Sequence, residues 1–341
     1  MNSAFRFARQ VKRALTGFNR RGVILTYHRV AQPASDPWQL CVSPEHFAEQ
    51  MEVIARCGLP VALPQMQRNL KRFSVGRKEI AITFDDGYAD NLHNAAPILV
   101  RYGMPAIFFV VSGALDSRKE FWWDELERLI LSPAALPETF DVAMDGVRYC
   151  YRIVSKQGAP TREYGQDITD MPPANAELSR LELYYVLSKI ISSLASEPKN
   201  TALRQISLWA NQSPQARSDY LPLAVKDLIS LAQNPLFEIG AHTVSHPKLS
   251  GLSTVEQETE ITRGKRELES ILGRPITSFS YPHGSYSDVT VEIVRRARLQ
   301  VACTIEGRPV SRSDDPFVLP RIIVSNWSGD LFEERLRRWL A

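Results

Sequence analysis

The chain has 341 residues, of which 44% are hydrophobic and 23% are charged, so it is long enough to fold around a substantial core. Its net charge of +3 at pH 7 is small, and its aromatic residues are not interleaved with basic clusters, which excludes nucleic acid as an expected partner. The cysteines are scattered along the chain and no two of them form a Cys-x-x-Cys pair, which argues against a thiolate metal site or a redox pair. No apolar run reaches the roughly 18 residues that a membrane-spanning helix needs.

Residues 1–20 are basic, contain no acid, and repeat apolar side chains at helical spacing. We expect an amphipathic helix that either lies on an anionic membrane surface or packs on the folded domain with its basic face in water. Because charges interrupt any apolar core, the segment does not read as a secretory signal. A cytoplasmic protein is therefore expected, in peripheral contact with the inner membrane surface if the first alternative holds.

Strand and helix patterns alternate over residues 21–112. Short apolar runs at 22–28, 60–63, 80–84 and 105–111 predict strands, and the segments at 44–56 and 89–101 predict helices. This alternation is typical of βα units and a parallel sheet.

The alternation stops near Gly113, and residues 113–235 show mainly helical periodicity and irregular polar stretches. We interpret this segment as a largely helical insertion that covers or borders a functional site. Trp122 and Trp123 lie within it, and two interpretations stay open for them. They either form a stacking platform for a sugar or anchor the insertion to the rest of the protein.

The strand–helix alternation resumes at residue 236, with further strands expected at 276–281, 300–305 and 318–324. Helices are expected at 254–272, 287–299 and 330–340. Residues 21–112 and 236–341 therefore predict one α/β barrel interrupted by the insertion.

Reactive side chains follow several of these strands, at the edge where α/β folds place their chemistry. They are His28, Asp85, Asp86, His242, His246 and His283. The adjacent carboxylates repel unless a cation or proton intervenes, although a solvated turn that caps a helix is the alternative. The His-x-x-x-His spacing places both rings on one side of a helical turn, so the two rings and a carboxylate form a set that holds a divalent ion. Such an ion lowers the pKa of bound water toward about 7, and the second aspartate can take the proton.

Three motifs resemble those of the polysaccharide deacetylases, the carbohydrate esterases of NodB homology. They are Thr83-Phe84-Asp85-Asp86-Gly87, His242-Thr243-Val244-Ser245-His246 and Phe279-Ser280-Tyr281-Pro282-His283-Gly284. The resemblance covers residues 21–112 and 236–325 but neither the insertion nor the chain ends.

The resemblance implies a distorted (β/α) barrel and metal-dependent removal of an N-acyl group, usually acetyl, from an amino sugar. Asp86, His242 and His246 would bind the metal, with zinc the commonest ion, and Asp85 would be the general base. Tyr281, His283 and Trp122 are the expected substrate contacts, with a backbone N–H near His283 binding the oxyanion. A residue that only closes a turn is the alternative for His283.

The sequence departs from the common family pattern in two places. Ser280 stands where an arginine that orients the base is usual, and no late Leu-x-His supplies an acid. Family members with a permuted barrel instead carry Tyr-His on the first strand and Leu-Pro-Arg on the last, and this chain has Tyr27-His28 and Leu319-Pro320-Arg321. We therefore expect His28 to protonate the leaving amine and Arg321 to orient Asp85, while a salt bridge without catalytic effect is the alternative for Arg321.

Three rival functions remain open from the sequence. The substrate is a glycan, a lipid-linked sugar or a sugar precursor in the main interpretation, whereas a deformylase or another amidase would use the same groups. A sugar-binding protein without activity is the second rival, although Asp85 has little use there. An iron oxygenase would fit the ligand types but not the α/β pattern.

Overall fold

The computed structural model describes residues 21–70, 78–155 and 171–341. The amphipathic helix expected at 1–20 lies outside the described residues, so its contact with a membrane stays a prediction. Within the described part of the chain, no helix combines the length and the apolar character that crossing a membrane requires.

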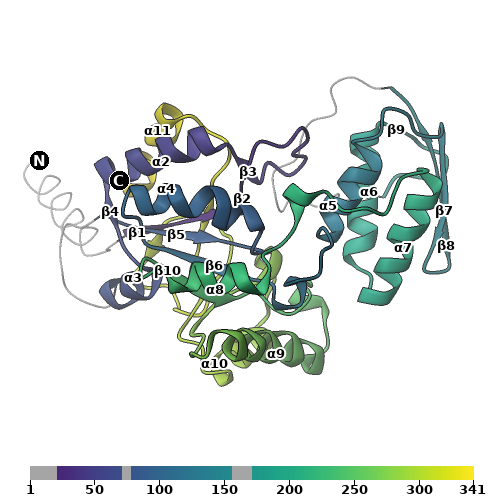
Figure 1. Ribbon diagram of the computed structural model, residues 1–341. Helices are drawn as coiled ribbons and strands as arrows, with labels where there is room; N and C mark the ends of the chain where they lie inside the picture. The colour runs from purple at the N-terminus through teal and green to yellow at the C-terminus, as the bar shows by residue number, and fades with distance from the viewer. Residues whose placement is uncertain (1–20, 71–77, 156–170) are drawn as a thin grey trace, which may run out of the picture.

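A curled sheet forms the centre of the larger unit, and helices cover its outside (Figure 1). The strands run in the order β12-β11-β10-β6-β5-β1-β13, with β14 beside β1 and β4 beside β5. Apart from β13, which is antiparallel to β1, the paired strands are parallel. Their bounds are β1 Arg21–Tyr27, β4 Leu59–Pro60, β5 Glu79–Phe84, β6 Ala106–Val110, β10 Phe237–Ala241, β11 Ser278–Ser280, β12 Val301–Cys303, β13 Val310–Ser311 and β14 Ile322–Ile323.

The two edges of the sheet approach one another through the chain segment before β14. Cys303 of β12 pairs with Leu319, and three residues further on Ile322 pairs with Leu25 of β1. The ring of strands therefore closes around an interior, which confirms the prediction of a distorted barrel. The pair of β2 (Arg29–Val30) and β3 (Cys41–Val42) lies outside this ring.

Side chains alternate between two buried layers along the strands, as a period of two residues requires. Ile80, Ile82 and Phe84 of β5 pack in the outer layer against helices, whereas Ala81 belongs to the inner layer. The helices around the barrel are α2 Pro44–Cys57, α3 Leu63–Leu70, α4 Ala96–Arg101, α8 Val225–Gln233, α9 Thr254–Leu272, α10 Asp288–Arg296 and α11 Gly329–Leu340.

Two local expectations differ from the structure. The strand expected at 60–63 ends at Pro60, because Leu63 begins α3 and buries its side chain. The helix expected at 89–101 starts with a wider π-helical turn, Asn91–Ala95, before α4. The amide of Asn91 donates to the carbonyl of His28 at 2.9 Å, which ties this turn to the end of β1.

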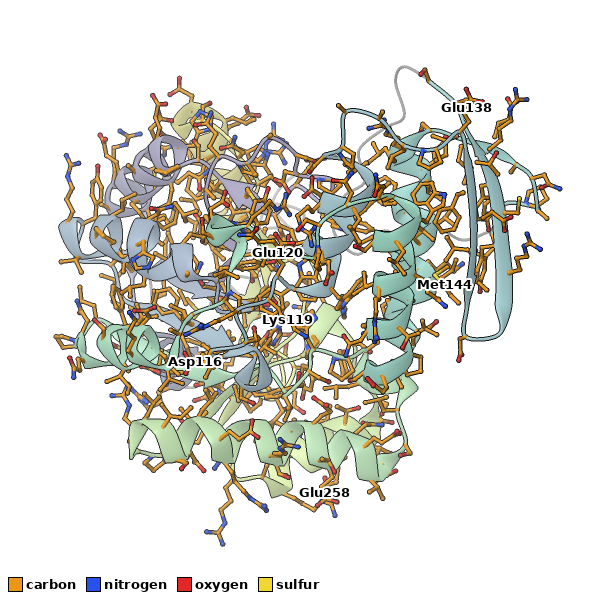
Figure 2. The ribbon with its side chains drawn as sticks, turned by 45° about the vertical axis from the view of Figure 1, so that its right-hand side comes forward. Asp116, Lys119, Glu120, Glu138, Met144 and Glu258 are labelled. Atoms are coloured by element: carbon orange, nitrogen blue, oxygen red, sulfur yellow. The ribbon has the colours of Figure 1, made fainter. Side chains whose placement is uncertain are left out.

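The insertion has a hydrophobic core of its own and contains strands that the helical pattern did not predict. Strands β7 (Thr139–Met144), β8 (Val147–Ile153) and β9 (Glu177–Leu178) form a small sheet beside α5 (Trp122–Ile130), α6 (Arg180–Ser192) and α7 (Ser196–Trp209). Glu138 and Met144 mark its far side, and Glu120 lies where it meets the barrel (Figure 2). Helix α8, which follows in the chain, packs on β10 and buries Leu228 and Leu231 in the barrel core.

Candidate metal centre

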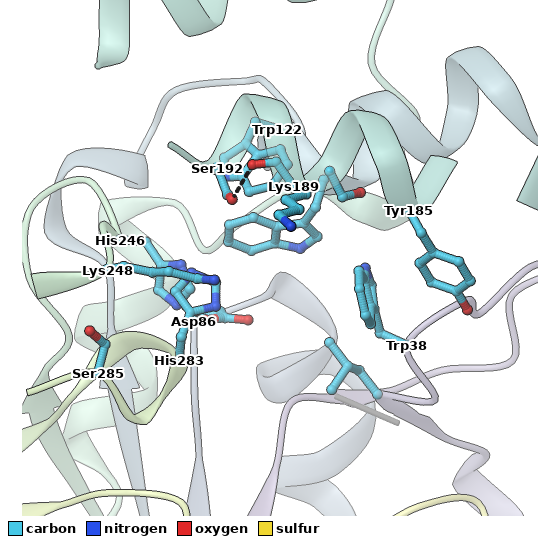
Figure 3. A pocket seen from close by; sticks show the side chains of 13 residues that line it. Trp38, Asp86, Trp122, Tyr185, Lys189, Ser192, His246, Lys248, His283 and Ser285 are labelled. Carbon is cyan, nitrogen blue, oxygen red and sulfur yellow. Dashed lines mark hydrogen bonds and ion pairs between the residues drawn. The ribbon is translucent and has the colours of Figure 1, made fainter. Parts of the chain in front are cut away.

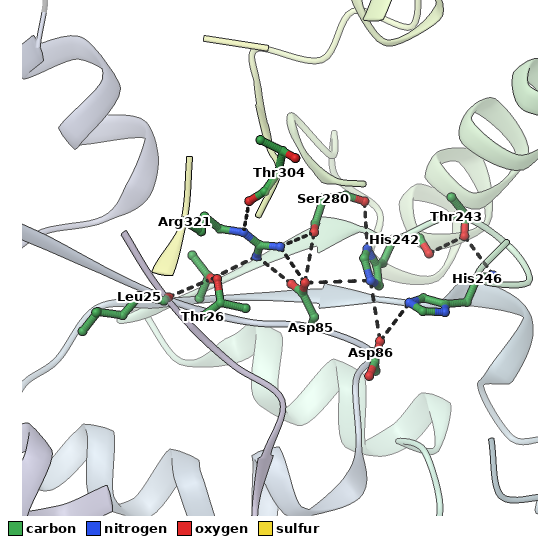
Figure 4. A network of polar contacts seen from close by, with 11 residues as sticks. Leu25, Thr26, Asp85, Asp86, His242, Thr243, His246, Ser280, Thr304 and Arg321 are labelled. Atoms are coloured by element: carbon green, nitrogen blue, oxygen red, sulfur yellow. Dashed lines mark hydrogen bonds and ion pairs between the residues drawn. The ribbon is translucent and has the colours of Figure 1, made fainter. Parts of the chain in front are cut away.

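The alternation of inward and outward side chains explains why distant polar residues meet at one end of the barrel. Positions 81 and 83 of β5 face the interior, so Asp85, two residues further on, continues on the same side. Ile239 and Ala241 of β10 pack in the outer layer, so Gly240 and His242, which alternate with them, lie on the inner side. Asp85 directly follows β5, His242 directly follows β10 and Arg321 directly precedes β14, and Figure 4 shows the three side chains in one polar network.

Asp86, His242 and His246 form a cluster whose potential ligand atoms all lie within 4.8 Å of one another. Nε2 of His242 lies 3.6 Å from Oδ1 of Asp86, and Nε2 of His246 lies 3.3 Å from the same oxygen. All three side chains are at most 3% exposed. The predicted ligands are therefore brought together, although they come from segments about half the chain apart.

Hydrogen bonding leaves the inward atoms of this cluster available for a cation. Nδ1 of His242 donates to the backbone carbonyl of Ser280 at 2.8 Å, so Nε2 carries the lone pair that faces Asp86. Oδ1 of Asp86 and both ring nitrogens of His246 are buried without a hydrogen-bond partner among the described residues. Buried polar atoms are rarely left so, and a divalent ion would satisfy them.

Burial lowers the pKa of His246 well below its usual value, and His283 and His242 lower this pKa further. The imidazole is therefore neutral at physiological pH, which is the form that binds a metal. Its ring lies 4.9 Å from that of His242 and 4.6 Å from that of His283, measured between centroids.

The two histidines converge through a turn and not through the helical geometry expected from their spacing. Thr243 and His246 have φ angles of 66° and 59°, in the left-handed region, and no helix spans the motif. Glu260 of α9 holds the turn, because its carboxylate accepts hydrogen bonds from the backbone N–H groups of Val244 and Ser245, each at 2.9 Å. The helical interpretation of this motif is therefore wrong, while the shared site that it predicted is present.

Asp85 lies beside the cluster and is held by Arg321. The guanidinium donates to both carboxylate oxygens, at 2.7 and 2.6 Å, and the hydroxyl of Ser280 donates at 3.2 Å (Figure 4). Burial raises the pKa of Asp85, but the charge of Arg321 and then of His242 outweigh burial, so the net pKa is lowered. Arg321 is fully buried, and its other donors bind Thr83 and the carbonyl of Thr304.

His28 follows β1 and is 2% exposed. Burial lowers its pKa, and the nearby charges of Asp86 and Asp85 partly offset that effect. The predicted acid therefore lies within electrostatic reach of both aspartates, but it is not part of the wall of the cavity described next.

A cavity of about 260 Å³ opens beside Asp86 and His246 and extends to the insertion. Trp122 and His283, two of the predicted substrate contacts, line it (Figure 3). Trp122 and Trp123 both belong to α5. The ring of Trp123 also lies 4.9 Å from His246. Trp123 thus both anchors the insertion and touches a candidate metal ligand, and the sequence alone offered no signal for that second contact.

The third predicted substrate contact, Tyr281, is placed elsewhere. Its side chain is fully buried and its hydroxyl donates to the carbonyl of Phe317 at 2.8 Å. Its backbone N–H donates to the carbonyl of Cys303 at 3.0 Å. The expectation for Tyr281 is corrected accordingly, since neither group faces the cavity.

The sequence profile of the family described as polysaccharide deacetylase matches residues 73–135 and 206–302. The unmatched part between these blocks contains most of the insertion. Both predicted metal-binding motifs lie inside the matched blocks, so the profile and the geometry point to the same segments.

The curated relatives and solved structures that are similar to the chain include the following proteins. A putative polysaccharide deacetylase, YxkH, of Bacillus subtilis is 29% identical over 111 residues, which are 32% of this chain and 39% of the relative. The poly-beta-1,6-N-acetyl-D-glucosamine N-deacetylase of Staphylococcus aureus is 22% identical over 125 residues, or 34% of this chain and 42% of that protein. The matches thus span about two fifths of these relatives.

The structure of the Streptococcus pyogenes deacetylase PplD, in complex with acetate, superposes with a TM-score of 0.58 at 18% identity. The superposition covers 95% of this chain and 99% of that one. At this identity the likeness establishes the fold.

Proposed function

Because the chain belongs to the polysaccharide deacetylase family, we propose that it is a metal-dependent hydrolase that removes an N-acetyl or other N-acyl group from an amino sugar. The substrate would be a glycan, a lipid-linked sugar or a sugar precursor. The observation that carries this proposal is the convergence of Asp86, His242 and His246 next to a second, separately held carboxylate, Asp85.

We propose zinc as the ion, bound by Asp86, His242 and His246. Two neutral imidazoles and one carboxylate are the ligand set of catalytic zinc sites that keep a position open. When bound, such an ion polarises the acyl carbonyl and makes a bound water more acidic. The carbonyl of Ser280 keeps His242 in the tautomer that this role requires.

Asp85 serves as the base in this proposal. Its carboxylate is ionised because Arg321 lies against both oxygens, so it can accept a proton from the attacking water. The same contact fixes the direction of the carboxylate, which is the role expected for Arg321 from the sequence.

His28 is proposed to protonate the leaving amine. Its lowered pKa means that it is mainly neutral in the free protein, and it must gain a proton during the reaction before it can donate one. Trp122 and His283, in the cavity wall, are proposed to contact the sugar.

The test measures bound metal, and acetate or formate release from a panel of N-acetylated and N-formylated sugars. Asp85→Asn is expected to retain the metal and to lose about 10²–10⁴-fold in rate, the usual contribution of general base catalysis. His242→Ala is expected to lose both metal and hydrolysis. Glu292→Gln, at an exposed position on α10, serves as the control. Full activity of Asp85→Asn would refute the base assignment, and formate release without acetate release would identify a deformylase.

A further inference from the structure

The cavity beside the metal centre is built jointly by the barrel and the insertion. Helix α6 contributes a single face, Tyr185, Ser188, Lys189 and Ser192, at spacings of three and four residues. The barrel contributes Trp38, from the loop between β2 and β3, and Lys248, two residues after His246. The cavity therefore lies where side chains of both the barrel and the insertion can contact a substrate.

Contacts between the two parts fix the position of α6 over the cavity. The ring of Trp38 lies 4.9 Å from that of Tyr185, and its indole N–H donates to the hydroxyl of Tyr184 at 2.8 Å. The hydroxyl of Tyr185 donates to the carbonyl of Pro37 at 2.7 Å. The residues that α6 presents to the cavity are thus held at a defined distance from the metal ligands.

Two kinds of side chain in the cavity wall, lysine and tryptophan, can donate hydrogen bonds but cannot accept them. Lys189 reaches in from α6 and Lys248 from the barrel side, and both extend toward the middle of the cavity (Figure 3). The indole nitrogen of Trp122 is buried without a hydrogen-bond partner among the described residues. An ammonium group and an indole N–H donate and cannot accept, so together they favour a ligand rich in acceptors.

The charges of the wall agree with this reading. Asp86 is the only acid among the described lining residues, and in the proposed function its charge is offset by the bound cation. The ammonium of Lys199 lies 5.1 Å from the ring centre of Trp122 and adds a further positive charge behind the wall. The cavity therefore carries a positive potential, and in a partly desolvated space such a potential attracts anions strongly.

We propose that the cavity selects an N-acyl amino sugar that bears an anionic substituent, a phosphate or a carboxylate, bound by Lys189 and Lys248. The aromatic side chains of Trp38, Trp122 and Tyr185 hold the sugar ring, and the metal centre receives the acyl group. This inference depends on the proposed function in one respect only, namely that the acyl group lies at the metal centre.

The size of the cavity limits what it encloses. Its volume of about 260 Å³ lies just below the roughly 300–1,000 Å³ of ordinary small-molecule sites. The enclosed part thus accommodates one sugar unit with its substituent, and the rest of a longer substrate extends into solvent.

Binding is tested with three small probes: N-acetylglucosamine, N-acetylglucosamine 1-phosphate and N-acetylmuramic acid. The tryptophans of the wall supply an intrinsic fluorescence signal, and the zinc-supplied Asp85→Asn variant prevents turnover. We expect at least one anionic probe to bind roughly tenfold or more tightly than the neutral sugar, as charge-assisted hydrogen bonds allow. The probe that shows the preference identifies phosphate or carboxylate as the recognised group.

Variants locate the preference in the two lysines. Lys189→Met and Lys248→Met should each reduce the preference for the anionic probe several-fold and change the affinity for the neutral sugar little. Lys189→Arg should keep the preference. Lys226→Met, which removes an exposed lysine from α8, is the matched control and should match the parent. Thermal melting of each variant verifies that it folds.

Equal affinity for all three probes would overturn the proposal, as would a preference that survives in the double variant Lys189→Met/Lys248→Met. Either result leaves the proposed function intact, because acetate release from a neutral sugar by the parent protein is measured separately. Conversely, binding of the anionic probe without any acetate release would support the anion site and contradict the proposed hydrolysis.

Discussion

The contact between Asp85 and Arg321 links a single residue to the pH dependence of the reaction. Two charge-assisted hydrogen bonds of 2.7 and 2.6 Å hold the carboxylate, and the guanidinium is fully buried. Burial by itself would favour the protonated acid, so the ionised base depends on the arginine. The arginine therefore determines both the charge and the direction of Asp85.

We expect Arg321→Lys to reduce kcat and to move the acid limb of the pH–rate profile to higher pH. A lysine lacks the planar fork that binds both oxygens, so the lowered pKa of Asp85 would rise toward or above its usual range. The base would then be protonated at pH values where the parent is active. A profile of kcat against pH for the parent and the variant measures the shift, and an unchanged acid limb would show that Arg321 has only a structural role.

At the scale of single residues, sequence motifs predicted the metal ligands, but nothing in the sequence predicted site residues that only the folded chain brings together. Asp86 and His242 stand at the ends of apolar strands and His246 follows four residues after His242, so their meeting point could be inferred from the common edge of a parallel sheet. Lys189 and Lys248 have no such signal, because only the packing of α6 over the barrel brings them together. Tyr281 belongs to a motif, but its direction depends on the alternation along β11, which the sequence pattern left open.

Helix α9 supports the turn that carries both histidines. Glu260 binds the backbone of Val244 and Ser245, and one turn further along the helix Gly264 lies directly under Thr243. A Cβ atom at Gly264 would lie 2.8 Å from the backbone carbon of Thr243, closer than real contacts allow. The absence of a side chain at this position is therefore what lets the helix and the turn approach each other.

Gly264→Ala is expected to weaken metal binding although alanine favours helices. The gain in helix propensity is about 1 kcal/mol, whereas the new methyl group must displace the turn between His242 and His246. Metal affinity, measured by competition with a chelator, should fall by an order of magnitude or more. Glu258→Ala, on the solvent side of the same helix (Figure 2), is the control. Parent-like affinity of Gly264→Ala would show that the turn can move without loss of the site.

The elements of the barrel were easier to predict than those of the insertion. Strands such as β5 and β6 are short, continuous apolar runs, so their pattern reflects burial on both faces. Strand β7 instead alternates exposed and buried residues, and β8 has a single fully buried residue, so neither resembles the barrel strands. The strands of this small sheet were therefore not predicted, because the composition of the insertion as a whole is helical and polar.

At the scale of the whole molecule, buried polar contacts join the insertion to the barrel. The hydroxyl of Tyr88, which follows the Asp85-Asp86 motif, donates to the carboxylate of Asp124 on α5 at 2.6 Å. The indole of Trp123 donates to the same hydroxyl at 2.7 Å. Arg217 binds Glu120 and Glu127 on the insertion side, and its guanidinium lies 3.4 Å from the ring centre of Tyr220. The metal centre and the insertion are thus mechanically connected through Tyr88 and Trp123.

This connection predicts that stability depends on pH through Asp124. Burial raises its pKa to about 7, an effect that Arg29 and the hydrogen bond from Tyr88 only partly offset. The unfolded carboxyl titrates near 3.9, so between about pH 4 and pH 7 the folded state binds more protons than the unfolded state. Stability from this group is therefore complete below about pH 4, decreases as pH rises toward 7, and is constant above.

Asp124→Asn isolates this contribution, because the amide keeps an acceptor for the hydroxyl of Tyr88 but carries no charge. We expect the variant to be more stable than the parent at pH 8, by up to about 4 kcal/mol, and equal to it near pH 4. Urea unfolding of both proteins between pH 4 and pH 8 measures the difference in their free energies of unfolding. The titration of all other groups is common to both proteins and cancels in this difference. Glu292→Gln, at an exposed position, should show no such pH-dependent difference. A variant that is less stable than the parent at pH 8 would mean that the ionised carboxylate, paired with Arg29, stabilises the junction instead.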